Sequence, residues 1–184
     1  AYAQAVALNP RNATVRRRLA RTLLEFGELD RARRVLEELI EMRPRDAASL
    51  HLSAEVELEL NNFTEAESIA RQLVELEPEG LRGPFILAQV HSRRREYQSV
   101  VDTLQPVVAE GRSRDIRPER LARSISLLGF AHEQLGNFQV AAQIYENAIE
   151  VMPNNLAFQT RLARAYVEVE RYEDATRVLV DARR

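Results

Sequence analysis

The stretch LGNFQVAAQIYENAIEVMPNN, from Leu135 to Asn155, repeats the pattern of an earlier one, FGELDRARRVLEELIEMRPRD, from Phe26 to Asp46. In both, an apolar residue stands two places after the Gly, an Ala five places after it and a Pro seventeen places after it. Between these positions the apolar residues recur three and four places apart, which is the spacing of an amphipathic helix. The chain therefore contains copies of one structural unit.

The prolines indicate the length of that unit. Pro10, Pro44 and Pro78 are separated by 34 residues, and Pro153 follows Pro78 by 75, which is two periods and seven extra residues. Each unit holds two helical patterns separated by Gly or Asn, which tolerate the left-handed backbone of a helix end, and its Pro stops the second helix. In this register two columns stay small or apolar: Ala5, Leu39, Leu73, Val107, Ala148 and Ala182, and Ala32, Ala66, Val100, Ala141 and Ala175.

These units resemble the tetratricopeptide repeat, whose period is about 34 residues. The resemblance covers the whole chain, although the family's tryptophan at position 4 is absent from every unit. It implies an all-α fold, a right-handed superhelical solenoid of antiparallel helix hairpins in which each hairpin buries the next. Positions are counted from Ala13. The family's small residue at position 8 is matched by Ala20, Ala54, Ala88, Gly129 and Ala163, and its small residue at position 20 by Ala32, Ala66, Ala141 and Ala175. Its aromatic residue at position 24 is matched by Tyr2 and Tyr145, and its proline at position 32 by Pro10, Pro44, Pro78 and Pro153.

We expect a single solenoid domain over residues 1–184, with a truncated unit (1–12) and five more: 13–46, 47–80, 81–121, 122–155 and 156–184. The third unit is atypical, because Pro84 falls in its first helix, Pro106 lies inside its second, and an Arg-rich insertion occupies Ala109–Arg123. A proline inside a helix costs about 3 kcal/mol. The insertion is either a tolerated surface segment or a hinge or docking site, and we expect this junction to be the least stable part of the array.

Composition excludes several kinds of chemistry. All 26 basic residues are Arg, and there is no Cys, so the chain lacks a phosphate-loop or Schiff-base lysine, thiolate zinc ligands and a cysteine nucleophile. No G-x-S-x-G, Gly-rich phosphate loop or H-E-x-x-H occurs. His91 and His132 share the column where the family usually has Tyr, so we interpret them as packing residues. We predict no enzymatic activity, no cofactor and no metal site.

Charge and hydropathy restrict the partners. The net charge is −2. The arginine triplets at 16–18 and 93–95 occur in a chain whose acidic residues are interspersed with the basic ones, so we interpret the triplets as solvated helix faces. We therefore predict no nucleic-acid partner. No stretch is long and apolar enough for a direct membrane span. Arginine without lysine indicates a GC-rich, bacterial genome, while the compartment, cytoplasm or periplasm, stays undecided because a leader is expected to be missing from this fragment.

The resemblance also implies where a partner binds. In this family, side chains at positions 2, 5, 9, 12 and 13 of the first helix of each unit line a concave groove. This mixture of Arg and apolar groups suits a peptide with carboxylates, because guanidinium pairs bidentately with them. The groove residues are Arg17, Arg21, Leu24, His51, Glu55, Leu58, Arg82, Phe85, Gln89, Arg123, Phe130, Glu133, Thr160, Arg164 and Glu168.

We therefore predict a non-catalytic scaffold that binds a protein or peptide partner. The heat-shock carboxylate clamp of the family is not matched, since its Lys and two Asn are replaced here by Arg17, Arg21 and Leu52. The alternative is a regulatory or docking segment of a larger enzyme or of a secretion or envelope assembly component. Because the chain begins in a second helix and ends without a polar cap, we expect flanking repeats or another domain, and weak self-association through the exposed ends: Tyr2, Ala5, Val6 and Leu8, and Ala175, Val178, Leu179 and Ala182.

Overall fold

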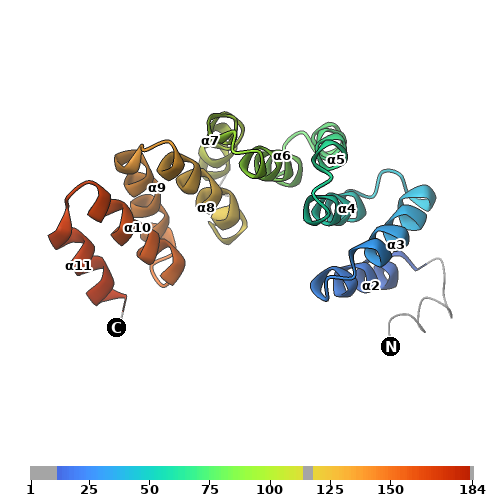
Figure 1. Cartoon of the computed structure of the whole chain (residues 1–184), viewed down its shortest axis with the longest axis horizontal. Coiled ribbons are helices and arrows are strands. Elements are labelled where there is room, and N and C mark those ends of the chain that lie inside the picture. The colour runs from blue at the N-terminus through green and yellow to red at the C-terminus, as the bar shows by residue number, and fades with distance from the viewer. Residues whose placement is uncertain (1–11, 114–117, 183–184) are drawn as a thin grey trace. The chain divides into compact units, whose positions relative to one another are not determined.

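The computed structural model describes residues 12–113 and 118–182, so residues 1–11 of the truncated first unit, with its apolar residues, lie outside the described part. Within these ranges the chain forms ten α-helices and no strands, which confirms an all-α solenoid of helical repeats (Figure 1). The helices are α2 (Ala13–Glu25), α3 (Leu29–Met42), α4 (Ala47–Glu59), α5 (Phe63–Leu76), α6 (Arg82–Arg93), α7 (Tyr97–Ser113), α8 (Pro118–Gln134), α9 (Phe138–Val151), α10 (Leu156–Glu168) and α11 (Tyr172–Asp181).

The turn inside every hairpin has one backbone conformation. Residue 15 of the repeat has a positive φ of 60° to 75° in all five hairpins. The N–H of the residue after it donates to the carbonyl five residues earlier, at 2.8–2.9 Å. These are the contacts of a Schellman helix end, which leaves the last carbonyls of the first helix satisfied. Gly27, Asn61 and Gly136 were expected to adopt this conformation, whereas Arg95 and Glu170 adopt it despite carrying side chains that disfavour it.

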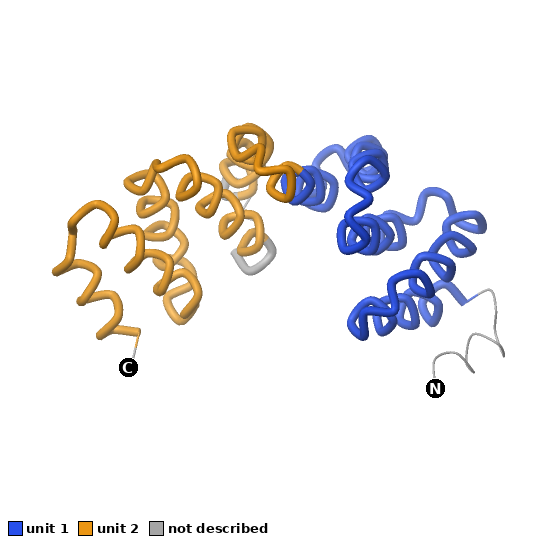
Figure 2. The backbone as a smooth tube through the Cα atoms, in the orientation of Figure 1, with its two compact units in different colours: residues 1–90 blue, residues 91–184 orange. Residues whose placement is uncertain are grey.

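The chain divides into two compact units, residues 1–90 and 91–184 (Figure 2). In the first, α2 packs on α3, α3 on α4, and α4 on α5, and α2 also contacts α4. The first helix of one hairpin therefore covers both helices of the hairpin before it. Two apolar clusters fill the space between them, one with Ala20, Leu23, Ala32, Leu36, Leu52 and Val56, the other with Leu50, Ala54, Leu58, Ala66, Ile69, Ala70, Leu73, Ile86 and Val90.

The second unit continues the same arrangement. Here α7 packs on α8, α8 on α9, α9 on α10 and α10 on α11. Tyr145 and Phe158 are the largest fully buried side chains, and their rings lie 6.1 Å apart between α9 and α10. In α11, Ala175 is buried whereas Leu179 is 46% exposed. Self-association through this helix remains a prediction.

The Arg-rich insertion lengthens two helices rather than the connection between them. At 17 residues, α7 is three residues longer than α3, α5 and α9, and α8 is four longer than α2, α4 and α10. The residues between them number four, 114–117, as between α3 and α4 and between α9 and α10, and one fewer than between α5 and α6. A Cβ on Gly111 would lie 2.8 Å from Leu121 Cδ2, so this glycine lets the extended α7 pack directly on α8.

Pro106 lies inside α7, as expected, and its ring faces solvent. It cannot donate a hydrogen bond to the Asp102 carbonyl, yet the helix continues to Ser113. The fourth first helix starts at Pro118, four residues before the expected unit boundary at Ala122. The low stability predicted for this junction therefore concerns a helix with one missing hydrogen bond, not a long loop.

Replacing Glu170 by Gly should raise the free energy of unfolding by about 0.5–1 kcal/mol. The left-handed conformation costs a residue with a side chain about 1–2 kcal/mol, and part of the gain is lost to the greater entropy of glycine in the unfolded chain. Glu173→Gly, within the first turn of α11, is the matched control and should lower stability. Denaturant unfolding followed by circular dichroism measures both changes. Equal losses in the two variants would contradict a strained backbone at residue 170.

Candidate partner-binding surface

All predicted groove residues lie on the first helices of the hairpins, namely α2, α4, α6, α8 and α10. We call the face that carries them the first-helix surface and describe it separately in each compact unit. In the first unit, α2 and α4 are in direct contact. Arg17, Arg21 and Leu24 of α2 and His51, Glu55 and Leu58 of α4 therefore belong to two helices that touch.

Most charged groups on the first-helix surface of the first unit are paired. Arg17 Nη1 lies 3.4 Å from Asp46 Oδ1, at the start of α4, and His51 Nε2 lies 3.6 Å from Glu55 Oε1 one turn along the same helix. Arg82 Nη1 donates to both carboxylate oxygens of Glu77, at 2.8 and 2.9 Å.

Arg21 on α2 differs from these paired residues. It is solvent-exposed and makes no ion pair or hydrogen bond with any described side chain. Of the predicted cations in the first unit, Arg21 is therefore the one that can meet a partner without first breaking an ion pair that the structure describes.

The predicted apolar residues of the first unit contribute mainly to packing. Leu58 and Phe85 are 3% and 8% exposed, and Leu24 packs against the apolar cluster around Leu36. Gln89 is half-buried, and its Oε1 atom is buried without a hydrogen-bond partner among the described residues. Repeat position alone did not distinguish these residues from exposed ones such as Arg21, because residues at the predicted positions differ in burial from one helix to the next.

In the second unit the structure brings Phe130 and Glu133 together with residues that the sequence analysis did not select. The Tyr145 hydroxyl donates to Glu133 Oε1 at 2.7 Å, and Arg161 Nη1 lies 3.5 Å from Glu133 Oε2. The Arg161 guanidinium also lies 5.8 Å from the Phe130 ring centre, whose other neighbour is the edge-on ring of Tyr97 at 6.0 Å. These contacts tie α8 to α7, α9 and α10.

The Tyr145 hydroxyl of this cluster stays protonated. Burial raises the pKa of Tyr145 well above its usual range, and the hydrogen bond and charge of Glu133 raise it further, so the phenol stays protonated and donates. The Glu133 side chain is only 8% exposed and is already bound on both oxygens. Glu133 is therefore a residue that positions Arg161, while Arg123 and Arg164 lie exposed on α8 and α10. Arg164 makes no ion pair within the described part of the chain.

A second cluster of the same three residue types joins α9, α10 and the start of α11. Tyr166 donates to Glu146 Oε1 at 2.5 Å, and the Arg171 guanidinium stacks 4.2 Å from the Tyr166 ring centre. Burial, reinforced by Glu146, raises the pKa of Tyr166 to about 12. In both places a tyrosine, a glutamate and an arginine join successive hairpins.

The histidines do not converge on a metal site in the part of the chain that the structure describes, where no group of three potential ligands occurs. His91 Nδ1 lies 2.7 Å from Glu96 Oε2. His132 is buried, and neither of its ring nitrogens has a hydrogen-bond partner among the described residues. Burial therefore lowers the pKa of His132, which holds the ring neutral.

Comparison with known families settles what this array is. The sequence profile of the tetratricopeptide repeat family matches residues 1–56 and 133–184, which is more than half of the chain. The chain belongs to the tetratricopeptide repeat family. Proteins of this family are typically non-catalytic, and their fold is a general scaffold for protein–protein interaction. No curated protein matches the chain in sequence.

Solved tetratricopeptide structures share the fold of the chain. MamA residues 41 to the end from Desulfovibrio magneticus RS-1 is 19% identical, with a TM-score of 0.71 and 92% of each chain covered. A putative kinesin light chain from Podosopora anserina with nearly identical repeats is 23% identical, with a TM-score of 0.73 and 95% of each chain covered. YrrB, described as having an unusual peptide-binding site, is 19% identical, with a TM-score of 0.62 and coverage of 99% of this chain and 90% of its own.

None of the tetratricopeptide helices in residues 12–113 and 118–182 has the length and apolar character needed to cross a membrane.

Gly129→Ala should destabilise the protein by about 1–3 kcal/mol, because a Cβ at this position would lie 2.4 Å from Tyr145 Cζ. Elsewhere the same two repeat positions hold Ala20 and Leu36, both fully buried. The double variant Gly129→Ala, Tyr145→Leu recreates that pair. In the Tyr145→Leu background, the alanine should therefore cost little or be favourable. Thermal unfolding of the four proteins measures the coupling, and strictly additive effects would contradict it.

Acid should destabilise the protein through His132. Its pKa is lowered in the folded state, so the unfolded chain takes up the proton first, and stability present above the ordinary histidine pKa of about 6.5 is lost as pH falls below it. His132→Leu should lessen this loss, and His91→Gln, at a side chain paired with Glu96, is the control substitution of another histidine. Denaturant unfolding at neutral and mildly acid pH measures the difference. The same acid loss in wild type and His132→Leu would exclude His132 as a source.

Proposed function

We propose that this tetratricopeptide chain is a non-catalytic scaffold that binds an acidic segment of a protein partner on its first-helix surface. The observation that carries the proposal is the presence of exposed arginines that are not engaged within the described residues, Arg21 on α2 and Arg164 on α10. The other cations at predicted positions for which the structure gives a partner, Arg17 and Arg82, already have carboxylates.

The chemistry of these arginines favours carboxylate ligands. A guanidinium can form two parallel hydrogen bonds with a carboxylate, which gives direction as well as charge attraction. An exposed ion pair contributes only about 0.2–1 kcal/mol, so affinity must come from several contacts along one segment. Within the first compact unit α2 contacts α4, and within the second α9 contacts α8 and α10, so each unit supplies neighbouring helices for such contacts by itself.

Two further points support a binding role over a catalytic one. The chain has no lysine or cysteine and no sequence motif of a nucleophile or phosphate-binding loop. YrrB shows that this fold has been described with a peptide-binding site, although the likeness concerns the fold alone.

The probe is a fluorescent peptide of alternating Glu and Leu, titrated with the protein at low salt and followed by anisotropy. Arg21→Ala and Arg164→Ala should each weaken binding about two- to fivefold, because each removes one exposed charge contact. Raising the salt concentration should weaken binding by the wild type more than binding by the variants.

The matched control is Arg82→Ala, which removes an arginine already bound by Glu77. It should change the affinity little. If the Arg21, Arg164 double variant bound the acidic peptide as tightly as the wild type, the assignment of these residues would be wrong.

A further inference from the structure

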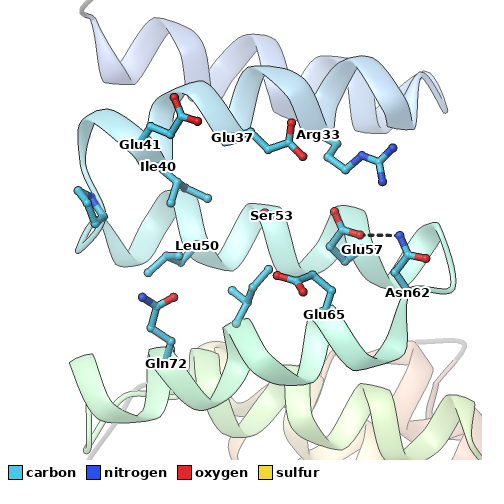
Figure 3. A pocket seen from close by; sticks show the side chains of 12 residues that line it. Arg33, Glu37, Ile40, Glu41, Leu50, Ser53, Glu57, Asn62, Glu65 and Gln72 are labelled. Atoms are coloured by element: carbon cyan, nitrogen blue, oxygen red, sulfur yellow. Dashed lines mark hydrogen bonds between the residues drawn. The ribbon is translucent and has the colours of Figure 1, made fainter.

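The first compact unit contains a cleft that the repeat analysis did not anticipate. It is open to solvent, has a volume of about 680 Å³, and lies between α3, α4 and α5 (Figure 3). Its floor is the face of α4 that carries Leu50, Ser53 and Glu57. At 3.6 residues per turn, this face lies roughly a third of a turn around α4 from the face that carries His51 and Glu55. The cleft is therefore separate from the first-helix surface.

Its charge is negative. Glu37 and Glu41 of α3 and Glu65 of α5 line the cleft, and none of them makes a hydrogen bond or ion pair with a described residue. The one arginine among the lining residues, Arg33, is held by Asp30 Oδ1 at 2.9 Å. Glu57, on the floor, accepts from Asn62 Nδ2 at 2.7 Å. Three carboxylates, those of Glu37, Glu41 and Glu65, therefore remain without a hydrogen-bond or ion-pair partner among the described residues.

Acceptors line both walls of the cleft. Glu37 of α3 and Glu65 of α5 come from opposite walls and lie on either side of Ser53 in the view of Figure 3. Ser53 is only 6% exposed and lines the floor of the cleft, and its hydroxyl makes no hydrogen bond with a described residue. It can therefore accept from, or donate to, water or a ligand in the cleft. Two facing carboxylates favour a cationic donor.

The walls also suit the stem of a basic side chain. Ile40 of α3 and Ile69 of α5 line the cleft beside the carboxylates. Arginine and lysine bury their methylene groups along apolar surface while the charged head reaches acceptors. Ligand pockets commonly have volumes of about 300–1000 Å³, so the cleft has room for more than one such side chain.

We infer that this cleft binds a basic segment of a partner protein, with an arginine or lysine side chain entering between Glu37 and Glu65 toward Ser53. Charge complementarity selects this occupant, since the unpaired charged groups that line the cleft, Glu37, Glu41 and Glu65, are all carboxylates. The preference is opposite in sign to that proposed for the first-helix surface and does not rest on it. The chain then offers separate sites for acidic and basic segments.

The probe is a short fluorescent peptide of alternating Arg and Leu, titrated with the whole chain at low salt. Glu37→Gln and Glu65→Gln keep the shape of the side chains and remove only their charge. The double variant should bind about tenfold more weakly or worse, the change expected when two charge-assisted hydrogen bonds are lost. The same peptide with neutral citrulline in place of Arg should bind the wild type as weakly as the Arg peptide binds the double variant.

The matched control is the double variant Glu25→Gln, Glu75→Gln. Both residues are exposed, neither lines the cleft, and the change in net charge is the same. It should keep the wild-type affinity within about twofold, since only distant, screened charges change. Arg21→Ala should also leave binding of the Arg peptide unchanged, which separates this site from the first-helix surface. Circular dichroism confirms that each variant is folded.

Several results would overturn the inference. Equal binding of the Arg peptide to the wild type and to the Glu37, Glu65 double variant would exclude these carboxylates. Equal loss in the Glu25, Glu75 control would show that only net charge matters. If sedimentation showed wild-type self-association that the Glu37, Glu65 variant lacks, the occupant would be a second copy of this chain rather than a different protein.

Discussion

Close approach of neighbouring helices at small residues is the constraint on which this array depends. Ala20, Ala54 and Ala88, at the same place in successive first helices, have no exposed surface, and Ala32, Ala66 and Ala141 are equally buried in the second helices. A larger side chain at these places would separate the helices and open the apolar clusters between hairpins. Because each hairpin forms part of the core of the next, the constraint recurs at every repeat.

The exception at Gly129 follows the same rule. Here the facing residue is Tyr145, which is larger than the Leu36 or Ala70 found at this place in other repeats, and the small residue becomes glycine. The space released by the missing Cβ is filled by the tyrosine ring, whose hydroxyl reaches Glu133. The largest residue at this place thus faces the smallest one, and a polar contact between helices becomes possible because the larger partner carries a hydroxyl.

The sequence was sufficient for the fold because the period is carried by backbone requirements that residue types report directly. Small residues, left-handed glycines and helix-ending prolines each have few alternatives. The left-handed backbone of Arg95 and Glu170 was not predicted, because the rest of the repeat determines the conformation of the turn and these residue types do not favour it. The insertion was read as a surface segment or as a hinge or docking site because its Arg-rich composition resembles a solvated connection, although arginine is also a good helix former.

The sequence was less informative about the surface. Repeat position predicts which helix a side chain is on, but long side chains choose their partners through many rotamers, so the pairing of Arg17 with Asp46 or of Arg161 with Glu133 was not predicted. The cleft was missed for a related reason. Its walls belong to two second helices and its floor to the first helix between them, so no single repeat position contains it.

The insertion has a consequence for how this chain can vary in length. It adds three residues to α7 and four to α8, close to one whole turn of each helix. Added whole turns leave the apolar stripe facing its neighbour, whereas a single added residue would rotate everything beyond it by about 100°. The helices of a repeat can therefore lengthen in steps of about one turn without changing which residues of the array face their neighbours.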